Sequence, residues 1–154
     1  MESVFDYRPI QWLKKNPTPD INSSTSHIDL TSDYFITIDG EDTKDLDDAI
    51  CITKTESGFL LKVAIADVSY FIKENSDIDK CAYDRGTSVY FADRVTPMLP
   101  PELSNGILSL IENTIRLAVI CEMQIDTNGN VINYKFYRGK ISNKHRLSYN
   151  EVHE

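Results

Sequence analysis

The chain has 154 residues, of which 41% are apolar, and a formal net charge of −8 at pH 7. This length and composition suffice for one domain with a hydrophobic core. The chain is too short for two domains to be expected. The acidic balance argues against unaided binding to a nucleic-acid backbone, and no apolar run approaches the roughly 20 residues of a membrane-spanning helix.

Residues 1–27 are predicted to form an irregular lead-in. They contain Pro9, Pro17 and Pro19 together with a polar run at residues 22–26, and both features disfavour a packed regular element. We therefore assign residues 28–154 to the folded domain.

Strand composition begins at residue 34. Residues 34–38 and 49–53 have the composition of strands, with many β-branched or aromatic side chains. Residues 50–53 and 59–65 also flank Ser57 and Gly58, which is the pattern of a β-hairpin.

The connection between the first two of these strands is strongly acidic, with six carboxylates that Lys44 alone offsets. Like charges a few ångströms apart repel, so a folded chain holds them together when they face water, shift their pKa values or share a cation. Carboxylate oxygens suit magnesium and manganese, and a substrate phosphate often completes the coordination of magnesium. The first hypothesis is therefore phosphoryl chemistry at a divalent metal, and the alternative is a solvated acidic loop. The six residues are Asp39, Glu41, Asp42, Asp45, Asp47 and Asp48.

The spacing of these acids requires a bend in the backbone. In an extended chain Asp45 and Asp47 point to one side, whereas Leu46 and Asp48 point to the other. A flat strand therefore cannot present all the aspartates to one ion. We expect a turn or bulge here, and Gly40 is able to supply one.

Helix and hairpin signals follow further along the chain. Ser76 is expected to cap a helix that ends near Gly86. Residues 97–101 hold three prolines and are expected to run irregularly over a surface or cleft. Residues 117–125 and 131–137 flank an Asn-Gly pair and predict a second hairpin. The predicted class is α+β, with a largely antiparallel mixed sheet and a few helices.

The end of the chain carries a helix start signal. Ser148 and Glu151 form a capping-box pattern, yet fewer than two helical turns follow. We therefore expect a chain that is cut inside a larger fold, and a short frayed turn fits the pattern equally well.

The cysteines indicate the cellular compartment. Cys51, Cys81 and Cys121 show no metal-ligand or redox spacing, and the N-terminus lacks a secretion signal. We expect buried reduced thiols and a cytoplasmic location.

Seven short motifs occur in a recognisable order: Thr37–Asp42, Asp45–Asp48, Val63–Ser69, Arg85–Phe91, Pro97–Pro100, Leu103–Gly106 and Tyr134–Tyr137. With them, residues 28–152 resemble the start of the RNB catalytic domain of the ribonuclease II/ribonuclease R family. Bacterial ribonuclease R is the most similar branch. Members of this family are several times longer and carry further nucleic-acid-binding barrels, as well as a later part of the catalytic domain that completes the active site.

The resemblance implies processive 3′→5′ hydrolysis of single-stranded RNA to nucleoside 5′-monophosphates with magnesium, or manganese in its place. DNA and membranes are not expected as partners. Asp39, Asp45, Asp47 and Asp48 match the family's catalytic, metal-binding aspartates. The logic of two-metal hydrolysis is that the ions polarise the phosphoryl oxygens and activate water. Because an isolated half-site stabilises the transition state poorly, the activity of this chain alone is doubtful.

Tyr90 matches the aromatic residue that clamps a nucleotide in the family. Stacking a base on a ring contributes roughly 1–3 kcal/mol per base. The alternative is that Tyr90 packs against the sheet, which its neighbours Val89 and Phe91 favour. For Asp67, which follows an apolar strand, a role in orienting backbone or ligands and a plain strand-end position are both open.

Other aromatic, basic and histidine side chains receive weaker interpretations. Tyr134, Phe136 and Tyr137 resemble a stacking stripe, although strand alternation places at least one face in the core. A basic region runs from Lys135 to Arg146, available for phosphate contacts or simply solvated. The histidines, including His27, show no arrangement with Ser or Cys that suggests a covalent nucleophile.

Two further functional hypotheses stay open. In one, the chain binds metal or a partner without catalysis and joins a separately encoded second half of the catalytic domain. An exposed apolar patch where that half packs would favour this hypothesis. In the other, the chain is a poorly folded fragment without cooperative unfolding.

Overall fold

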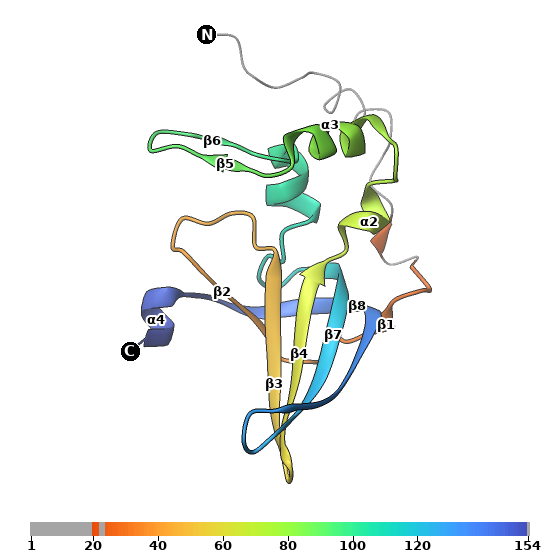
Figure 1. Cartoon of the computed structure of the whole chain (residues 1–154), viewed down its shortest axis with the longest axis vertical. Helices are drawn as coiled ribbons and strands as arrows, with labels where there is room; N and C mark the ends of the chain where they lie inside the picture. Colours follow the sequence, from red (N-terminus) through yellow and green to blue (C-terminus); the bar gives the residue numbers. More distant parts are fainter. Residues whose placement is uncertain (1–19, 22–23, 154) are drawn as a thin grey trace.

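A computed structural model of the chain describes residues 20–21 and 24–153 as a strand-rich domain with a few short helices (Figure 1). The lead-in predicted for residues 1–27 therefore lies largely outside the described residues. The predicted α+β class with a mixed sheet is confirmed. In chain order the elements are β1 (Ile28–Asp29), β2 (Phe35–Asp39), β3 (Asp48–Thr55), β4 (Gly58–Ala66), α2 (Val68–Phe71), α3 (Asp77–Arg85), β5 (Val89–Tyr90), β6 (Val95–Thr96), the wide helical turn η2 (Leu103–Ile107), β7 (Ile115–Asp126), β8 (Val131–Ser148) and α4 (Tyr149–His153).

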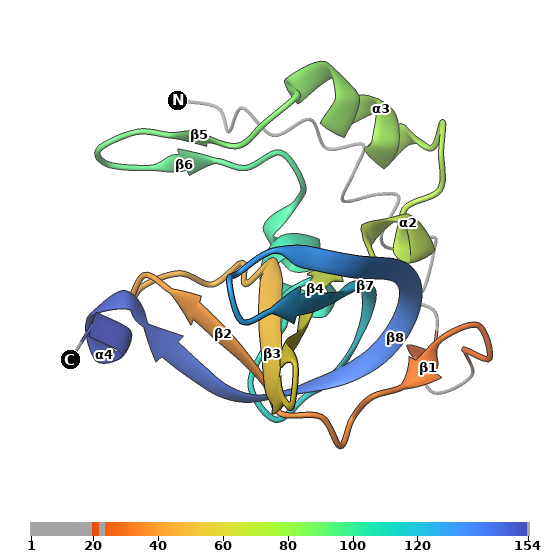
Figure 2. The ribbon, with the colours of Figure 1, turned by 60° about the horizontal axis from the view of Figure 1, so that its bottom comes forward.

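Five strands close into a ring. The pairs β2–β3, β3–β4, β4–β7 and β7–β8 are antiparallel, and β8 returns to pair with β2 in parallel. The 18-residue β8 makes this closure, because its first part pairs with β7 and its last part with β2. Figure 2 shows β8 sweeping across the sheet toward β2 and α4. The sheet is thus largely antiparallel, as predicted, and its parallel pairs are β2–β8, which closes the ring, and β1–β8.

The core fills the inside of this ring. Ala49, Ala64 and Ala118 lie on neighbouring strands and are at most 1% exposed. Such small side chains leave room within a closed sheet for larger ones, and Phe35 and Ile120 occupy it with no exposed surface. A second apolar cluster, which includes Phe71, Ile78, Leu103 and Leu117, lies where α2, α3 and η2 pack on the end of the ring.

The two predicted hairpins are present. Thr55 pairs with Gly58 at the β3–β4 turn. Gly58 has φ +140°, and a Cβ atom there would collide with the carbonyl oxygen of Ile125, so glycine is required. In the β7–β8 turn, the carboxylate of Asp126 accepts hydrogen bonds from the backbone N–H groups of residues 128 and 130.

The predicted helix signals are also present. The Ser76 hydroxyl accepts from Asp79 N–H at the start of α3, and Gly86 ends α3 in the left-handed conformation. Ser148 and Glu151 bond reciprocally at the start of α4. Residues 97–100 carry no regular element, as expected. Pro101, the last residue of the segment predicted to be irregular, is instead the first residue of a helical turn that runs into η2, a position where proline needs no N–H partner.

The three cysteines form no disulfide among the described residues, as predicted. Cys51 is buried, whereas Cys81 and Cys121 are only half-buried, so the prediction of buried thiols is wrong for these two. Across residues 20–21 and 24–153, no helix is long and apolar enough to span a bilayer. The cytoplasmic location stays a prediction.

Candidate active site

The four candidate aspartates come together at one end of the ring, where β2 ends and β3 begins. Asp39 is the last residue of β2, and Asp48 is the first residue of β3. Because these two strands pair in antiparallel fashion, both residues lie at the same end of the sheet. Asp45 and Asp47 belong to the connecting loop, residues 40–47, called the acidic loop below.

The backbone bends within this segment, as the spacing of the acids requires. Leu46 and Ala49 are both buried, yet Asp47 and Asp48 between them are both exposed. An extended strand would instead alternate buried and exposed residues. A turn also begins at Gly40, whose carbonyl accepts from the N–H of residue 43 (3.1 Å). The bends let Asp47 and Asp48 both face solvent, while Leu46 and Ala49 on either side of them stay buried in the core.

Ser109 fixes the acidic loop from a distant part of the sequence. Its hydroxyl accepts from Leu46 N–H (3.1 Å) and donates to the carbonyl of Lys44 (2.7 Å). The Leu46 carbonyl accepts from Leu110 N–H (2.9 Å), and Ser109 itself has no exposed surface. The guanidinium of Arg116 in turn donates to the Ser109 carbonyl (2.8 Å). Sequence reasoning missed this clamp, because serine carries no signal of its position in the fold.

Partial burial and the neighbouring carboxylates raise the pKa values of Asp39 and Asp47. Partial burial, followed by repulsion from Asp48, raises the pKa of Asp39, while the cation of Arg146 opposes this shift. For Asp47, partial burial of the carboxylate and then the charges of Asp45, Asp48 and Asp39 raise the pKa. The four carboxylates therefore form one electrostatic cluster, in which a divalent cation would relieve the repulsion.

This cluster fits magnesium by its chemistry. Its donors are all carboxylate oxygens, which magnesium prefers, and their mutual repulsion favours a bound cation. Within residues 20–21 and 24–153, no three His, Cys, Asp or Glu side chains converge into a ready coordination shell. Magnesium usually takes only one or two carboxylates from the protein, with waters and phosphate as the other ligands, so a shell of three is not required.

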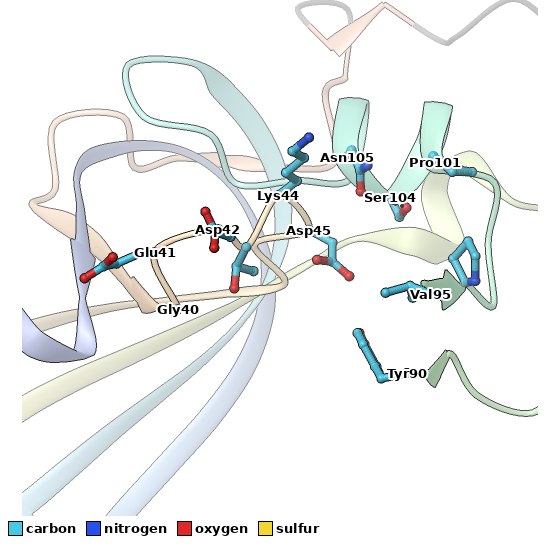
Figure 3. Close-up of a pocket in the computed structure, with 12 residues that line it drawn as sticks. Gly40, Glu41, Asp42, Lys44, Asp45, Tyr90, Val95, Pro101, Ser104 and Asn105 are labelled. Carbon is cyan, nitrogen blue, oxygen red and sulfur yellow. Dashed lines mark hydrogen bonds between the residues drawn. The ribbon is translucent and has the colours of Figure 1, made fainter. Parts of the chain in front are cut away.

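A cleft of about 590 Å³ opens beside the acidic loop. Residues 40–45 form one wall, and Tyr90 and Val95 from the hairpin β5–β6 lie on the other (Figure 3). Figure 3 shows the Asp45 carboxylate on the side of the loop that faces Tyr90. The polar side chains of Ser104 and Asn105, at η2, line the same cleft. The structure thus brings Asp45 and Tyr90 to one cleft, with Asp39, Asp47 and Asp48 in the neighbouring cluster.

Tyr90 is not part of the sheet core. The hairpin β5–β6 projects from the ring, and Tyr90 is 68% exposed. Val89 and Phe91, which favoured packing in the sequence, are themselves 43% and 49% exposed. The aromatic ring is therefore accessible to a ligand in the cleft.

Arg146 supports the acidic loop from β8. Its guanidinium donates to the carbonyl of Gly40 (3.1 Å) and to that of Glu41. The side-chain amide of Asn150, in α4, donates to the Glu41 carboxylate (3.0 Å). The C-terminal part of the described chain thus holds the start of the loop that carries the aspartates.

Most of the predicted basic region is engaged within the protein. Lys135 pairs with Glu122 (2.9 Å), Arg138 pairs with Asp67 (3.0 Å), and Lys144 donates to a backbone carbonyl (2.7 Å). These groups, like Arg146, are fixed by internal partners rather than held ready as a phosphate-binding stripe.

His27 belongs to a buried network. Its Nε2 lies 3.1 Å from the Asp67 carboxylate, and its Nδ1 lies 2.5 Å from the hydroxyl of Ser24. Sequence reasoning found no histidine arrangement that suggests a covalent nucleophile, and it did not predict this buried contact. All three residues are at most 7% exposed, which leaves no room for a substrate and makes the network structural. Asp67 also accepts from the N–H of Tyr70 at the start of α2, so of its two open roles it orients backbone.

Comparison with known proteins places this geometry in a family context. The RNB domain profile matches residues 27–154. Ribonuclease R of Mycoplasmopsis pulmonis is 52% identical over 126 residues, which cover 82% of this chain and 17% of that protein. Ribonuclease R of Escherichia coli is 45% identical over 131 residues, which cover 84% of this chain and 16% of that protein. The chain thus spans about a sixth of the length of these curated relatives.

Solved structures of other proteins share this fold. RNase R of Mycoplasma genitalium in complex with double-stranded RNA superposes with a TM-score of 0.91 at 36% identity, covering 97% of this chain and 27% of that one. The complex of the same enzyme with ribose methylated single-stranded RNA superposes with a TM-score of 0.90 at 37% identity, and the match covers 97% of this chain and 23% of that one. Yeast Ssd1, described as a pseudonuclease, shares the fold with a TM-score of 0.77 at 18% identity. The fold alone is therefore compatible with proteins that do not cleave RNA.

Proposed function

The chain belongs to the RNB-domain family, and from this premise we propose that it supplies one half of a 3′→5′ exoribonuclease site. The reaction is the metal-dependent hydrolysis of single-stranded RNA to nucleoside 5′-monophosphates. The observation that carries the proposal is the shared cleft, with Asp45 on one wall and the exposed ring of Tyr90 on the other.

Each wall has a distinct task. The ring of Tyr90 stacks on a base near the 3′ end and holds the strand in a manner that tolerates any sequence, at roughly 1–3 kcal/mol per base. Asp39, Asp45, Asp47 and Asp48 hold magnesium or manganese. A bound metal supplies Lewis-acid polarisation of the phosphate and lowers the pKa of water. The Ser109 clamp and Arg146 keep the carboxylates in place without contacting the substrate.

Full activity requires more than this chain. Its relatives are about five times as long, and an acidic half-site alone provides few groups that stabilise a transition state. We propose that the remainder of a ribonuclease R-type catalytic domain completes the site. The alternative function is binding of metal or a partner without catalysis. This alternative is supported by yeast Ssd1, a pseudonuclease that has the same fold.

A chimera tests the proposal. In ribonuclease R of Mycoplasmopsis pulmonis, the 126-residue segment that matches is replaced by its counterpart from this chain. We expect the chimera to shorten 5′-labelled single-stranded RNA from the 3′ end with magnesium, and to stop when EDTA is added. Asp47→Asn should abolish cleavage, whereas Asp84→Asn, an exposed acid on α3, should not.

The outcomes separate the candidate functions. A chimera that is folded and binds RNA but does not cleave it would favour the non-catalytic alternative. Cleavage that survives Asp47→Asn would refute the assignment of the aspartates. The isolated chain, assayed in parallel, should show little or no cleavage, and full activity there would refute the need for a second half.

A further inference from the structure

The outer surface of the ring carries an apolar face across four neighbouring strands. Paired residues of adjacent strands point to the same side of a sheet. Ile52 on β3 pairs with Leu61 on β4, Leu61 pairs with Met123 on β7, and Met123 pairs with Tyr134 on β8. These four side chains form one row, and the two at its ends, Ile52 and Tyr134, are 59% and 61% exposed.

A second apolar row lies beside the first. Ile50, Val63, Cys121 and Phe136 are paired in the same way across β3, β4, β7 and β8. Phe136 is 66% exposed, and its ring centroid lies 5.8 Å from that of Tyr134 in the first row. The strands that carry both rows lie side by side in Figure 1. We call these two rows the outer apolar face.

The outer apolar face points away from the core. The neighbours of the second row on β3, β4 and β7 are buried inside the ring, namely Ala49, Ala64 and Ile120, and Tyr137 on β8 packs partly buried against the same core. Strand alternation therefore directs the eight residues outward. Contiguous apolar surface of this kind is uncommon on a monomer and usually marks an interaction site.

The chemistry of the face selects a protein partner over RNA. None of its eight residues is charged, and aliphatic side chains occupy its centre. The nearby cations of Lys135 and Arg138 are paired with Glu122 and Asp67. A nucleic-acid surface would need cations free to meet phosphates. An apolar polypeptide surface, such as one face of an amphipathic helix, meets the observed chemistry.

The length of the relatives identifies the partner. The chain covers 27% of the Mycoplasma genitalium RNase R chain and 17% of the Mycoplasmopsis pulmonis protein, so in both most of the polypeptide lies outside the matching part. We infer that the outer apolar face is the surface on which the remainder of a ribonuclease R-type catalytic domain docks. This inference rests on the proposed function and assigns a surface to its second half.

Cys121 offers a direct test, because it lies within the face and is half-buried in this chain. Its alkylation rate is measured by peptide mass spectrometry in the chain of residues 1–154 and in the chimera described above, each normalised to the rate in denaturant. We expect alkylation at least about tenfold slower in the chimera, since docking would remove Cys121 from solvent. Equal rates in a chimera that cleaves RNA would overturn the docking face and leave the proposed function intact.

A second measurement uses the downstream part of the Mycoplasmopsis pulmonis protein as a separate polypeptide. We expect it to bind the chain in a titration, and Ile52→Lys with Phe136→Ser to weaken binding at least about tenfold. Tyr83→Ser, which removes an 85% exposed aromatic ring from α3, should leave binding unchanged. Equal binding by the face variant, self-association of the chain through this face, or protection of Cys121 by single-stranded RNA would each overturn the inference.

Discussion

Removal of the Ser109 hydroxyl tests the clamp on the acidic loop. In Ser109→Ala, Leu46 N–H loses its acceptor at 3.1 Å, and the Lys44 carbonyl loses its donor at 2.7 Å. Leu46 is 3% exposed and Ser109 0%, so water does not readily replace the hydroxyl at the Leu46 N–H. The Lys44 carbonyl belongs to an exposed residue, where water is able to replace the lost bond.

The cost follows from the one buried donor left unpaired, about 1–3 kcal/mol in the free energy of unfolding. For a domain of this size, each kcal/mol corresponds to a decrease in melting temperature of about 2–4 °C. With a urea m-value of about 2 kcal/mol/M, the midpoint should fall by about 0.5–1.5 M.

The assay is urea unfolding followed by circular dichroism, with Ser57→Ala in the exposed β3–β4 turn as the matched control. The control should lie within about 0.5 kcal/mol of the unmodified chain. If Ser109→Ala also stays within that range, the clamp does not fix the loop. Loss of cooperative unfolding in the unmodified chain would instead support a poorly folded fragment.

Three further predictions follow from the site and the fold. The raised pKa of Asp47 means that its ionisation opposes folding. In EDTA, Asp47→Asn should therefore be more stable than the unmodified chain at pH 7, and this difference should shrink as the pH falls toward 4 and Asp47 takes up a proton. A less stable Asp47→Asn in urea at pH 7 would contradict the repulsion. Arg146→Gln should speed tryptic cleavage after Lys44 several-fold, because the loop loses its charged donor. Arg94→Gln serves as the control and should leave the rate unchanged, since the Arg94 guanidinium contacts Asp93 and Phe91 of its own hairpin and not the acidic loop. Equal rates of Lys44 cleavage would show that the loop is held without Arg146. Gly58→Ala places a Cβ against the backbone carbonyl of Ile125 and should lower the melting temperature by about 5 °C or more. A variant that melts at the same temperature as the unmodified chain in a thermal scan would contradict this close contact between β4 and β7.

The candidate site is partly visible in the sequence. The density of aspartates between two strands and their match to a family motif are enough to single out Asp39, Asp45, Asp47 and Asp48. The sequence leaves the placement of Tyr90 undecided, because its apolar neighbours favour packing. Its 68% exposure and its place opposite Asp45 follow from the projecting hairpin, which short-range patterns do not predict.

Local signals determined the local elements of this protein. The Asn-Gly turn, the cap at Ser76 and the capping box at Ser148 act through residues a few positions away, so the sequence alone was enough to predict them. Tertiary structure decided the parallel closure of β8 on β2, the Ser109 clamp on Leu46 and the contact of His27 with Asp67. These contacts join residues far apart in the chain, and they form only when strand register and side-chain packing are satisfied together. No short pattern of residues carries that information, because register and packing are properties of the whole closed sheet.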